Sequence, residues 1–280
     1  MPIKILYTVF AFASHRLTII IFVPYSDFCI RIASSNTLIH YSIDNKMSSK
    51  NVVLKTVVFM GSARDITPPW GGASRLGDGI LNWVKHKISN RSSKLGCACN
   101  TDDDEVEITH DITVFDPLVV FGKDGALAES GAEMKTPHFF FKEGEAPPKM
   151  NEMAATIRAA DCYVIVTPEY NHSLPPALSS MMGHFGGSGY AYKPSAIITY
   201  SPSPYGGSRG AVALRPFLSE LGCLPVSKLA CFSAVGDIFN EDGSVKDDSN
   251  RQLKQLDDLL DQLEWLTIAC MNQKKAYGIP

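Results

Sequence analysis

The chain has 280 residues, of which 45% are hydrophobic, 20% charged and 10% aromatic. This composition is typical of a globular protein, and it excludes collagen, a largely disordered chain and a membrane protein with several spans. Lysine and arginine total 26 against 29 acidic residues, which gives a formal net charge of -3. Such a balance argues against a protein that neutralises many phosphates along a nucleic acid, so we expect no nucleic-acid partner.

The seven cysteines do not suggest a disulfide framework, because their number is odd and their spacing is irregular. Cys97 and Cys99 form the only close pair, and no matching Cys/His pair follows at zinc-binding spacing. A chain of this length can bury most of its apolar surface without a disulfide or metal. We therefore expect reduced cysteines, a cytoplasmic protein and no metal site.

Residues 1–50 differ in pattern from the rest of the chain. Their first half is mostly apolar and contains Lys4 and Arg16 but no acidic residue. Three targeting interpretations compete: a signal peptide, a transit peptide and, more weakly, a membrane span, in which Arg16 would cost about 2.5–3.5 kcal/mol. Alternatively, Met47 resembles a natural start and what precedes it is an upstream extension. We assign residues 1–50 to an extension outside the core and residues 51–280 to the functional domain.

From residue 51 onward, strand patterns and helix patterns alternate. Apolar or alternating segments predict five strands, at residues 52–60, 106–115, 162–167, 195–200 and 229–234. Apolar residues at helical spacing predict helices near residues 76–88, 150–160, 175–184, 211–221 and 253–266. This alternation predicts an α/β fold with a doubly wound, five-stranded parallel sheet. The alternating second strand suits a sheet edge, which favours the flavodoxin-like order 2-1-3-4-5.

Ligands of such sheets bind at the carboxyl ends of the strands, and three loops of unusual composition follow there. The first loop contains Gly61, Ser62, Ala63 and Arg64. Small residues, a hydroxyl and a guanidinium suit a phosphate group. Arg75, at the start of the next helix, could supply a second cation. The alternative is a solvated turn with surface arginines.

The second loop contains Pro168, Glu169, Tyr170 and Asn171. Its backbone N–H groups and the Asn171 amide could read the polar edge of a flat heterocycle, and Tyr170 offers an aromatic face. The alternative is a proline turn that caps the following helix through Ser173.

The third loop starts at Ser201 and contains Tyr205, Gly206, Gly207 and Ser208. Its glycines permit a close approach of the backbone to a ligand, and the alternative is an exposed flexible loop. Ser208 also matches the G-x-S-x-G pattern of serine hydrolases. We reject that interpretation, because the hydrolase serine directly follows its strand and precedes a histidine, and here neither condition holds.

Several other catalytic and nucleotide-binding motifs are absent from the sequence. It contains no P-loop, no G-x-G-x-x-G after the first predicted strand and no H-E-x-x-H. Nucleotide hydrolysis on a P-loop, a Rossmann dinucleotide core and a zinc hydrolase are therefore not supported.

Taken together, three short patterns resemble the NADPH-dependent FMN reductases. They are Gly61-Ser62-x-Arg64 after the first strand, P-E-Y-N-x-S from Pro168, and Gly206-Gly207 after the fourth strand. The family consists of flavodoxin-like proteins and includes quinone and azo-dye reductases. The resemblance covers about residues 51–270, and P-E-Y-N-x-S is its most specific part.

The resemblance implies a bound FMN, with the first loop on its phosphate and the other two loops on either side of its ring system. The predicted cofactor-binding residues are Gly61, Ser62, Ala63, Arg64, Arg75, Pro168, Glu169, Tyr170, Asn171, Ser201, Tyr205, Gly206, Gly207 and Ser208. Family members have a shorter link between the phosphate-loop arginine and the next helix, which leaves the role of Arg75 open. The stretch 121–148 is also longer than is usual in the family and could modify substrate access.

The resemblance further implies an enzyme in which FMN takes a hydride from NADPH and passes electrons to a quinone, a flavin or a similar acceptor. It implies a homodimer or homotetramer, and no side chain is assigned as a catalytic acid or base. Glu169 is expected to support flavin retention more than hydride transfer. The alternative is a non-enzymatic flavodoxin-like module for electron transfer or redox sensing, although a net charge of -3 is small for an electron shuttle.

Overall fold

The computed structural model describes residues 7–13, 16–22, 33–34, 37–38, 50–66, 69, 75–95 and 106–279. Met47, Cys97 and Cys99 lie outside the described residues. The chain divides into two compact units, namely Met1–Asn51 with Lys94–Glu107, and Val52–Ser93 with Ile108–Pro280. No helix in the described part of the chain is long and apolar enough to cross a membrane.

The first unit contains two small antiparallel strand pairs. They are β1 (Tyr7–Ala13) with β2 (Arg16–Phe22), and β3 (Ala33–Ser34) with β4 (Thr37–Leu38).

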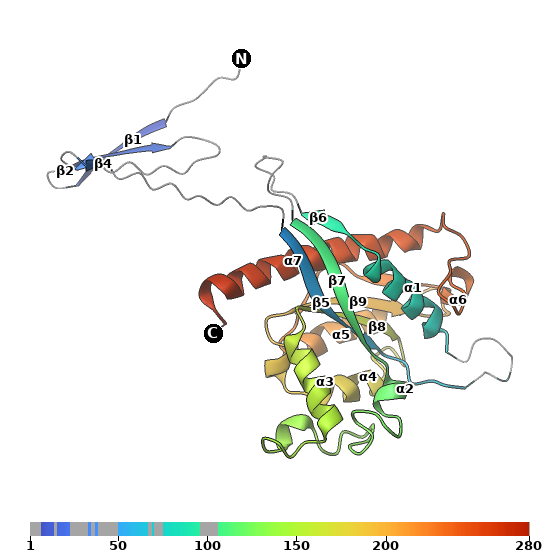
Figure 1. Ribbon diagram of the computed structural model, residues 1–280. Coiled ribbons are helices and arrows are strands. Elements are labelled where there is room, and N and C mark those ends of the chain that lie inside the picture. The colour runs from blue at the N-terminus through green and yellow to red at the C-terminus, as the bar shows by residue number, and fades with distance from the viewer. Residues whose placement is uncertain are drawn as a thin grey trace. The chain divides into compact units, whose positions relative to one another are not determined.

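The large sheet has the predicted strand order (Figure 1). Its strands run in the order β10 (Leu224–Pro225), β9 (Pro194–Tyr200), β8 (Cys162–Pro168), β5 (Lys50–Met60), β7 (Val106–Phe115) and β6 (Ser93–Leu95), and β11 (Ala230–Phe232) also pairs with β9. Strands β5, β8, β9 and β11 pair in parallel. In chain order the five predicted strands give 2-1-3-4-5, which confirms the prediction. The short strands β6 and β10 are additional, and β6 occupies the edge that we predicted for β7.

Five of the helices follow the predicted sequence of elements, and two helices of four residues are additional. The helices are α1 (Gly77–Ser89), α2 (Pro117–Val120), α3 (Pro148–Ala159), α4 (Pro176–Gly183), α5 (Ser208–Glu220), α6 (Val235–Ile238) and α7 (Lys254–Tyr277), with 3-10 turns η1 (His138–Phe140), η2 (Gly187–Gly189) and η3 (Arg251–Leu253). The last helix continues eleven residues beyond its predicted end and stops before Gly278, whose φ is 79°.

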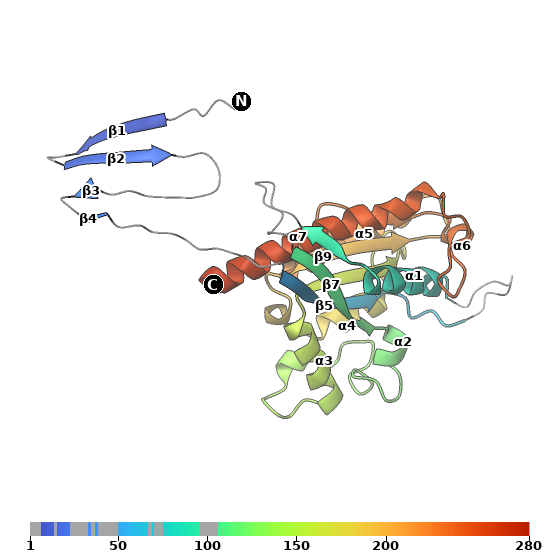
Figure 2. The same cartoon turned by 45° about the horizontal axis from the view of Figure 1, so that its top comes forward.

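Helices cover both faces of the sheet, and each face has its own apolar core (Figures 1 and 2). Val58 and Met60 of β5 pack with residues of α1 and α7. Val57 and Phe59 point to the other face and pack with residues of α3, α4 and α5. Alternate side chains of one strand therefore contribute to the two cores, as expected for a sheet that is buried on both sides.

A buried polar cluster attaches α7 to the sheet. Glu264 is 1% exposed, and its carboxylate accepts hydrogen bonds from Arg91 (2.5 Å) and Ser93 (2.5 Å) and lies 2.9 Å from His110 Nε2. The other ring nitrogen of His110 lies 2.8 Å from Thr56 Oγ1 on β5. Burial raises the pKa of Glu264, but hydrogen bonds with His110, Arg91 and Ser93 outweigh it and lower the pKa. The carboxylate is therefore charged at neutral pH.

Candidate cofactor site

The first loop follows β5, and its first residue packs closely against the end of β8. The Gly61 N–H donates to the Val166 carbonyl (2.8 Å). A Cβ at Gly61 would lie 2.1 Å from Thr167 Oγ1, so only glycine fits without a shift of β8. This close approach places the rest of the loop at the carboxyl ends of both strands.

Tyr170 of the second loop contacts two predicted residues of the first. Its hydroxyl lies 3.1 Å from Ser62 Oγ, which also accepts the Arg64 N–H (3.3 Å). The Arg64 guanidinium stacks over the Tyr170 ring, 4.6 Å from its centroid. Ser62 is buried, whereas Ala63 and Arg64 are exposed. The structure therefore joins the first two loops and leaves a guanidinium at the surface.

Arg75 contacts the first loop through the backbone carbonyl of Ser62. It is 8% exposed and donates to both oxygens of Asp116 (2.8 and 2.6 Å), to Asp78 (2.7 Å) and to the Ser62 carbonyl (3.0 Å). Burial lowers the pKa of Arg75, but hydrogen bonds to Asp116 and Asp78 outweigh it and raise the pKa above its ordinary value. The guanidinium is charged, and two carboxylates face it.

The second loop is a tight turn at the end of β8. Tyr170 and Ser173 exchange two backbone hydrogen bonds (3.0 and 2.9 Å). Between them, Asn171 and His172 have left-handed φ values of 50° and 62°, as in a type I′ turn, and both side chains are exposed. The next helix, α4, has Pro175 as its N-cap and no side-chain cap, so Ser173 does not cap it.

Glu169 connects the second loop with the third. Its side chain is 7% exposed, and its carboxylate accepts the backbone N–H groups of Arg209 (3.0 Å) and Gly210 (3.1 Å) and pairs with the Arg209 guanidinium (2.7 Å). Helix α5 has Gly207 as its N-cap, which offers no side-chain acceptor, so Glu169 caps the helix from another loop. Burial raises the pKa of Glu169, but hydrogen bonds from Gly210 and Arg209 outweigh it and lower the pKa.

The two glycines of the third loop are required by its backbone. Gly206 and Gly207 have left-handed φ values of 60° and 76°. A Cβ at Gly206 would lie 3.0 Å from the Cys231 backbone, and one at Gly207 would lie 3.0 Å from Thr199 Cβ. The predicted glycines therefore fit the loop against β9 and β11.

The remaining predicted residues of the third loop occupy different positions. Ser201 continues the strand pattern, because its N–H donates to the Phe232 carbonyl (3.0 Å). Tyr205 is 63% exposed, and the Arg209 guanidinium lies over its ring, 4.8 Å from the centroid. Ser208 is exposed and begins α5. Tyr205 and Ser208 thus lie at the surface of the loop.

A buried hydroxyl at the end of β9 packs against the start of α1. Tyr200 Oη has no hydrogen-bond partner within the described part of the chain, although Tyr200 is 3% exposed. A Cβ at Gly77, the first residue of α1, would lie 2.1 Å from that oxygen. This oxygen is enclosed by protein, so the group of this region that is available to an anion such as the FMN phosphate is the exposed guanidinium of Arg64.

Sequence reasoning missed three residues: Asp116, Tyr200 and Arg209. Tyr200 is the last residue of β9, and Asp116 directly follows β7. Arg209 follows the predicted residue Ser208. These positions could have identified all three from the sequence. Pro168, the last residue of β8, is buried.

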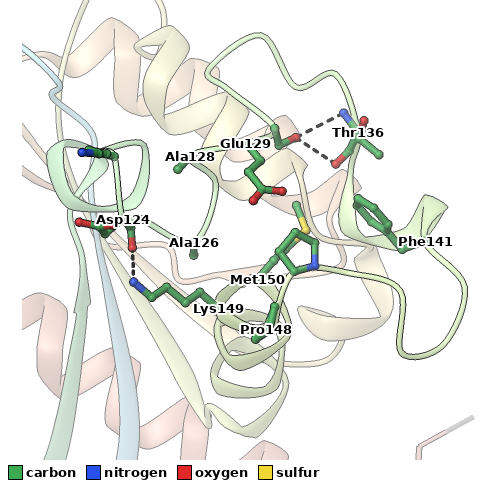
Figure 3. A pocket seen from close by; sticks show the side chains of 13 residues that line it. Asp124, Ala126, Ala128, Glu129, Thr136, Phe141, Pro148, Lys149 and Met150 are labelled. Carbon is green, nitrogen blue, oxygen red and sulfur yellow. Dashed lines mark hydrogen bonds between the residues drawn. The ribbon is translucent and has the colours of Figure 1, made fainter.

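A cavity of about 480 Å³ lies in the long stretch between α2 and α3 (Figure 3). Its wall contains none of the predicted cofactor-binding residues. Lys149 Nζ donates to the Asp124 carbonyl at the wall, and Ser130 Oγ lies 2.7 Å from Nε2 of the buried His184. His184 Nδ1 can only donate to the Ser180 carbonyl, so Nε2 is the acceptor when the ring is neutral. Burial lowers the pKa of His184, which favours the neutral ring.

The fold and the loop geometry define a flavodoxin-like protein. A solved relative is the flavoenzyme NAD(P)H:(acceptor) oxidoreductase FerB from Paracoccus denitrificans, with a TM-score of 0.51 and 18% sequence identity. The similarity covers 76% of this chain and 98% of FerB. At this identity the likeness supports the fold alone.

The family follows from the sequence. Residues 54–236, which are more than half of the chain, match the model of the NADPH-dependent FMN reductases, and the protein belongs to this family. It is 30% identical over 112 residues to a quinone reductase of Pseudomonas putida, and 31% identical over 113 residues to an NAD(P)H-dependent FMN reductase of Pseudomonas aeruginosa. These matches cover 38% and 39% of this chain, and only 60% and 61% of the two relatives.

Proposed function

We propose that the protein is an FMN-dependent oxidoreductase that takes a hydride from NADPH and passes electrons to a quinone, a flavin or a similar small acceptor. The observation that carries this proposal is the connection of three loops at the carboxyl ends of β5, β8 and β9. Membership of the FMN reductase family supports FMN as the cofactor, and the names of the two bacterial relatives support a reductase.

In this proposal the first loop holds the phosphate of FMN. Gly61 provides the turn, Ser62 and Ala63 offer backbone N–H groups, and the exposed Arg64 offers a planar pair of donors. Tyr170 orients the Arg64 guanidinium by stacking against it.

The second and third loops border the flavin ring. On one side are Pro168 to Asn171, and on the other are Tyr205 to Ser208. Bound FMN supplies the hydride and electron chemistry. The protein binds and orients the reactants, and Glu169 holds the two loops together without contact with the reacting atoms.

We also propose a homodimer or homotetramer in the cytoplasm, with residues 1–50 as an extension and residues 51–280 as the reductase domain. All four cysteines in the described part of the chain, Cys162, Cys223, Cys231 and Cys270, are free thiols, which suits a reducing compartment.

The visible spectrum of the purified full-length protein, recorded before and after anaerobic addition of NADPH, tests the proposal. A yellow protein that bleaches is the expected result, because flavin must be bound and must accept the hydride. A yellow protein that does not bleach would favour the non-enzymatic module. A colourless protein that cannot be loaded with FMN would refute the cofactor. Repeating the reduction with NADH at equal concentration measures the nucleotide preference.

A further inference from the structure

We infer that Asp116 positions the phosphate-binding loop for FMN, and that it acts through Arg75. This inference rests on the proposed function, because the loop concerned is the one proposed to hold the FMN phosphate. It gives Asp116 a role in cofactor selectivity and makes Arg75 a positioning residue.

Asp116 accepts hydrogen bonds both from the start of α2 and from Arg75. It directly follows β7, and its Oδ1 accepts the Leu118 N–H (2.9 Å), which caps α2. The same carboxylate accepts two hydrogen bonds from Arg75, at 2.8 and 2.6 Å. Such a bidentate pair fixes the plane of the guanidinium as well as its distance. The orientation of Arg75 is thereby set from the carboxyl end of β7.

Arg75 transmits this orientation to the first loop through one peptide group. Its Nη1 donates to the Ser62 carbonyl at 3.0 Å. That carbonyl and the Ala63 N–H belong to the same planar trans peptide, so they point in opposite directions. Fixing the carbonyl toward Arg75 turns the Ala63 N–H away from Arg75, and Ala63 is an exposed residue. An N–H held in this direction is one of the donors proposed for the FMN phosphate.

Electrostatics alone predicts that Asp116 weakens FMN binding, which is the opposite of the effect that we infer. Arg75 faces the two carboxylates of Asp78 and Asp116, and these three groups together carry one net negative charge. They therefore give no net attraction to a phosphate. Removing the Asp116 charge should strengthen FMN binding if only electrostatics matters, whereas it should weaken FMN binding if the carboxylate holds the loop through Arg75.

The substitution Asp116→Asn separates these two effects. Asparagine caps a helix as well as aspartate does, so α2 keeps its N-cap while the ion pair with Arg75 is lost. We expect the Kd of FMN for the flavin-free, full-length protein to rise about tenfold, the scale of one hydrogen bond between charged groups. The Kd of riboflavin, which has no phosphate, should stay within about twofold. Titration of flavin fluorescence measures both constants.

Two further variants complete the test. Asp111→Asn removes an exposed charge on β7, the strand that precedes Asp116, and should leave both constants unchanged. Arg75→Lys keeps a positive charge but cannot bind Asp116 and Ser62 together in a fork, so FMN should weaken while riboflavin does not. This variant also serves if Asp116→Asn does not fold.

Each outcome has a definite meaning. An unchanged or lower Kd of FMN for Asp116→Asn, with FMN binding intact in the natural protein, would overturn the inference alone. Equal weakening of FMN and riboflavin would also overturn it, because it would show general damage to the site. If the natural protein binds neither flavin, the proposed function fails and the inference fails with it.

Discussion

Because Glu169 caps α5, its contribution to the free energy of unfolding can be predicted. The substitution Glu169→Gln keeps the shape of the side chain and one oxygen acceptor but removes the charge. The loss includes a charged acceptor at a helix N-terminus and an ion pair with Arg209, whose side chain is 41% exposed. A helix cap contributes about 1 kcal/mol, and the charge terms contribute about 0.5 kcal/mol each. With one acceptor retained, we expect the free energy of unfolding at pH 7 to fall by about 1–2 kcal/mol.

The dependence on pH follows from the lowered pKa of Glu169. A carboxyl group with a lower pKa in the folded state stabilises the protein fully above its unfolded value, which is about 4.3. This stabilisation is lost as the pH falls through the folded pKa. The difference in unfolding free energy between the natural protein and Glu169→Gln should therefore be constant from about pH 6 to pH 8 and should shrink below about pH 4.

Urea unfolding at pH 7 and near pH 4 measures this difference. The control is Glu220→Gln at the opposite end of α5, where removing an exposed negative charge should be neutral or slightly stabilising. A Glu169→Gln variant as stable as the natural protein at pH 7, or a difference that does not shrink in acid, would refute the cap. The Glu169 variant should also lose flavin more readily while its hydride-transfer rate, once loaded, stays within about twofold, the range left by intact reacting groups.

Three other predictions concern the loop, the α7 anchor and a buried thiol. Gly61→Ala places a methyl group 2.1 Å from Thr167 Oγ1, so thermal melting should show a loss of about 1–3 kcal/mol together with lower FMN content. Glu264→Ala removes the buried carboxylate that Arg91, Ser93 and His110 share and should cost about 3–5 kcal/mol in urea unfolding, whereas Asp261→Ala, with a side chain 70% exposed, should cost less than about 1 kcal/mol. Because burial raises the pKa of the Cys162 thiol to about 12, peptide mapping should find it unlabelled by a thiol reagent at pH 8 until the protein unfolds.

The sequence predicted the sheet order because its strands carry strong, separate signals. All seven residues of β8 are buried, and this burial corresponds to the continuous apolar run seen in the sequence. Strand β6 has no such signal, since Ser93, Lys94 and Leu95 form a strand only through pairing with β7. Short edge strands of this kind depend on tertiary contacts rather than on local pattern.

The positions of the three loops could be predicted, but the directions of their side chains could not. Glu169 belongs to the P-E-Y-N-x-S pattern, yet its carboxylate binds N–H groups forty residues later in the chain. Arg75 was a candidate phosphate ligand because of its charge alone. Its pairing with Asp116 depends on the packing of β7 beside β5, which no local pattern encodes.

Three contacts hold the candidate site together before any ligand is considered. Tyr170 connects the second loop to Ser62, Glu169 connects it to α5, and Arg75 connects the first loop to Asp116. Ordering a loop residue costs about 1–2 kcal/mol of conformational entropy, so loops that are already connected leave more of the ligand contact energy for affinity.

These contacts predict two kinds of variant, which differ in whether the unfolding free energy falls together with the affinity for FMN. A substitution at Glu169 or Asp116 loosens a loop, so a loss of protein stability should accompany the loss of FMN affinity. Arg64 is exposed and stacks on a tyrosine, so Arg64→Met should weaken FMN binding with less than about 0.5 kcal/mol of destabilisation, as is usual for surface substitutions. Flavin affinity and unfolding free energy, measured on the same three variants, should fall together for the first two and diverge for the third. If Arg64→Met lost stability in proportion to affinity, the guanidinium would be part of the scaffold rather than a contact for the phosphate.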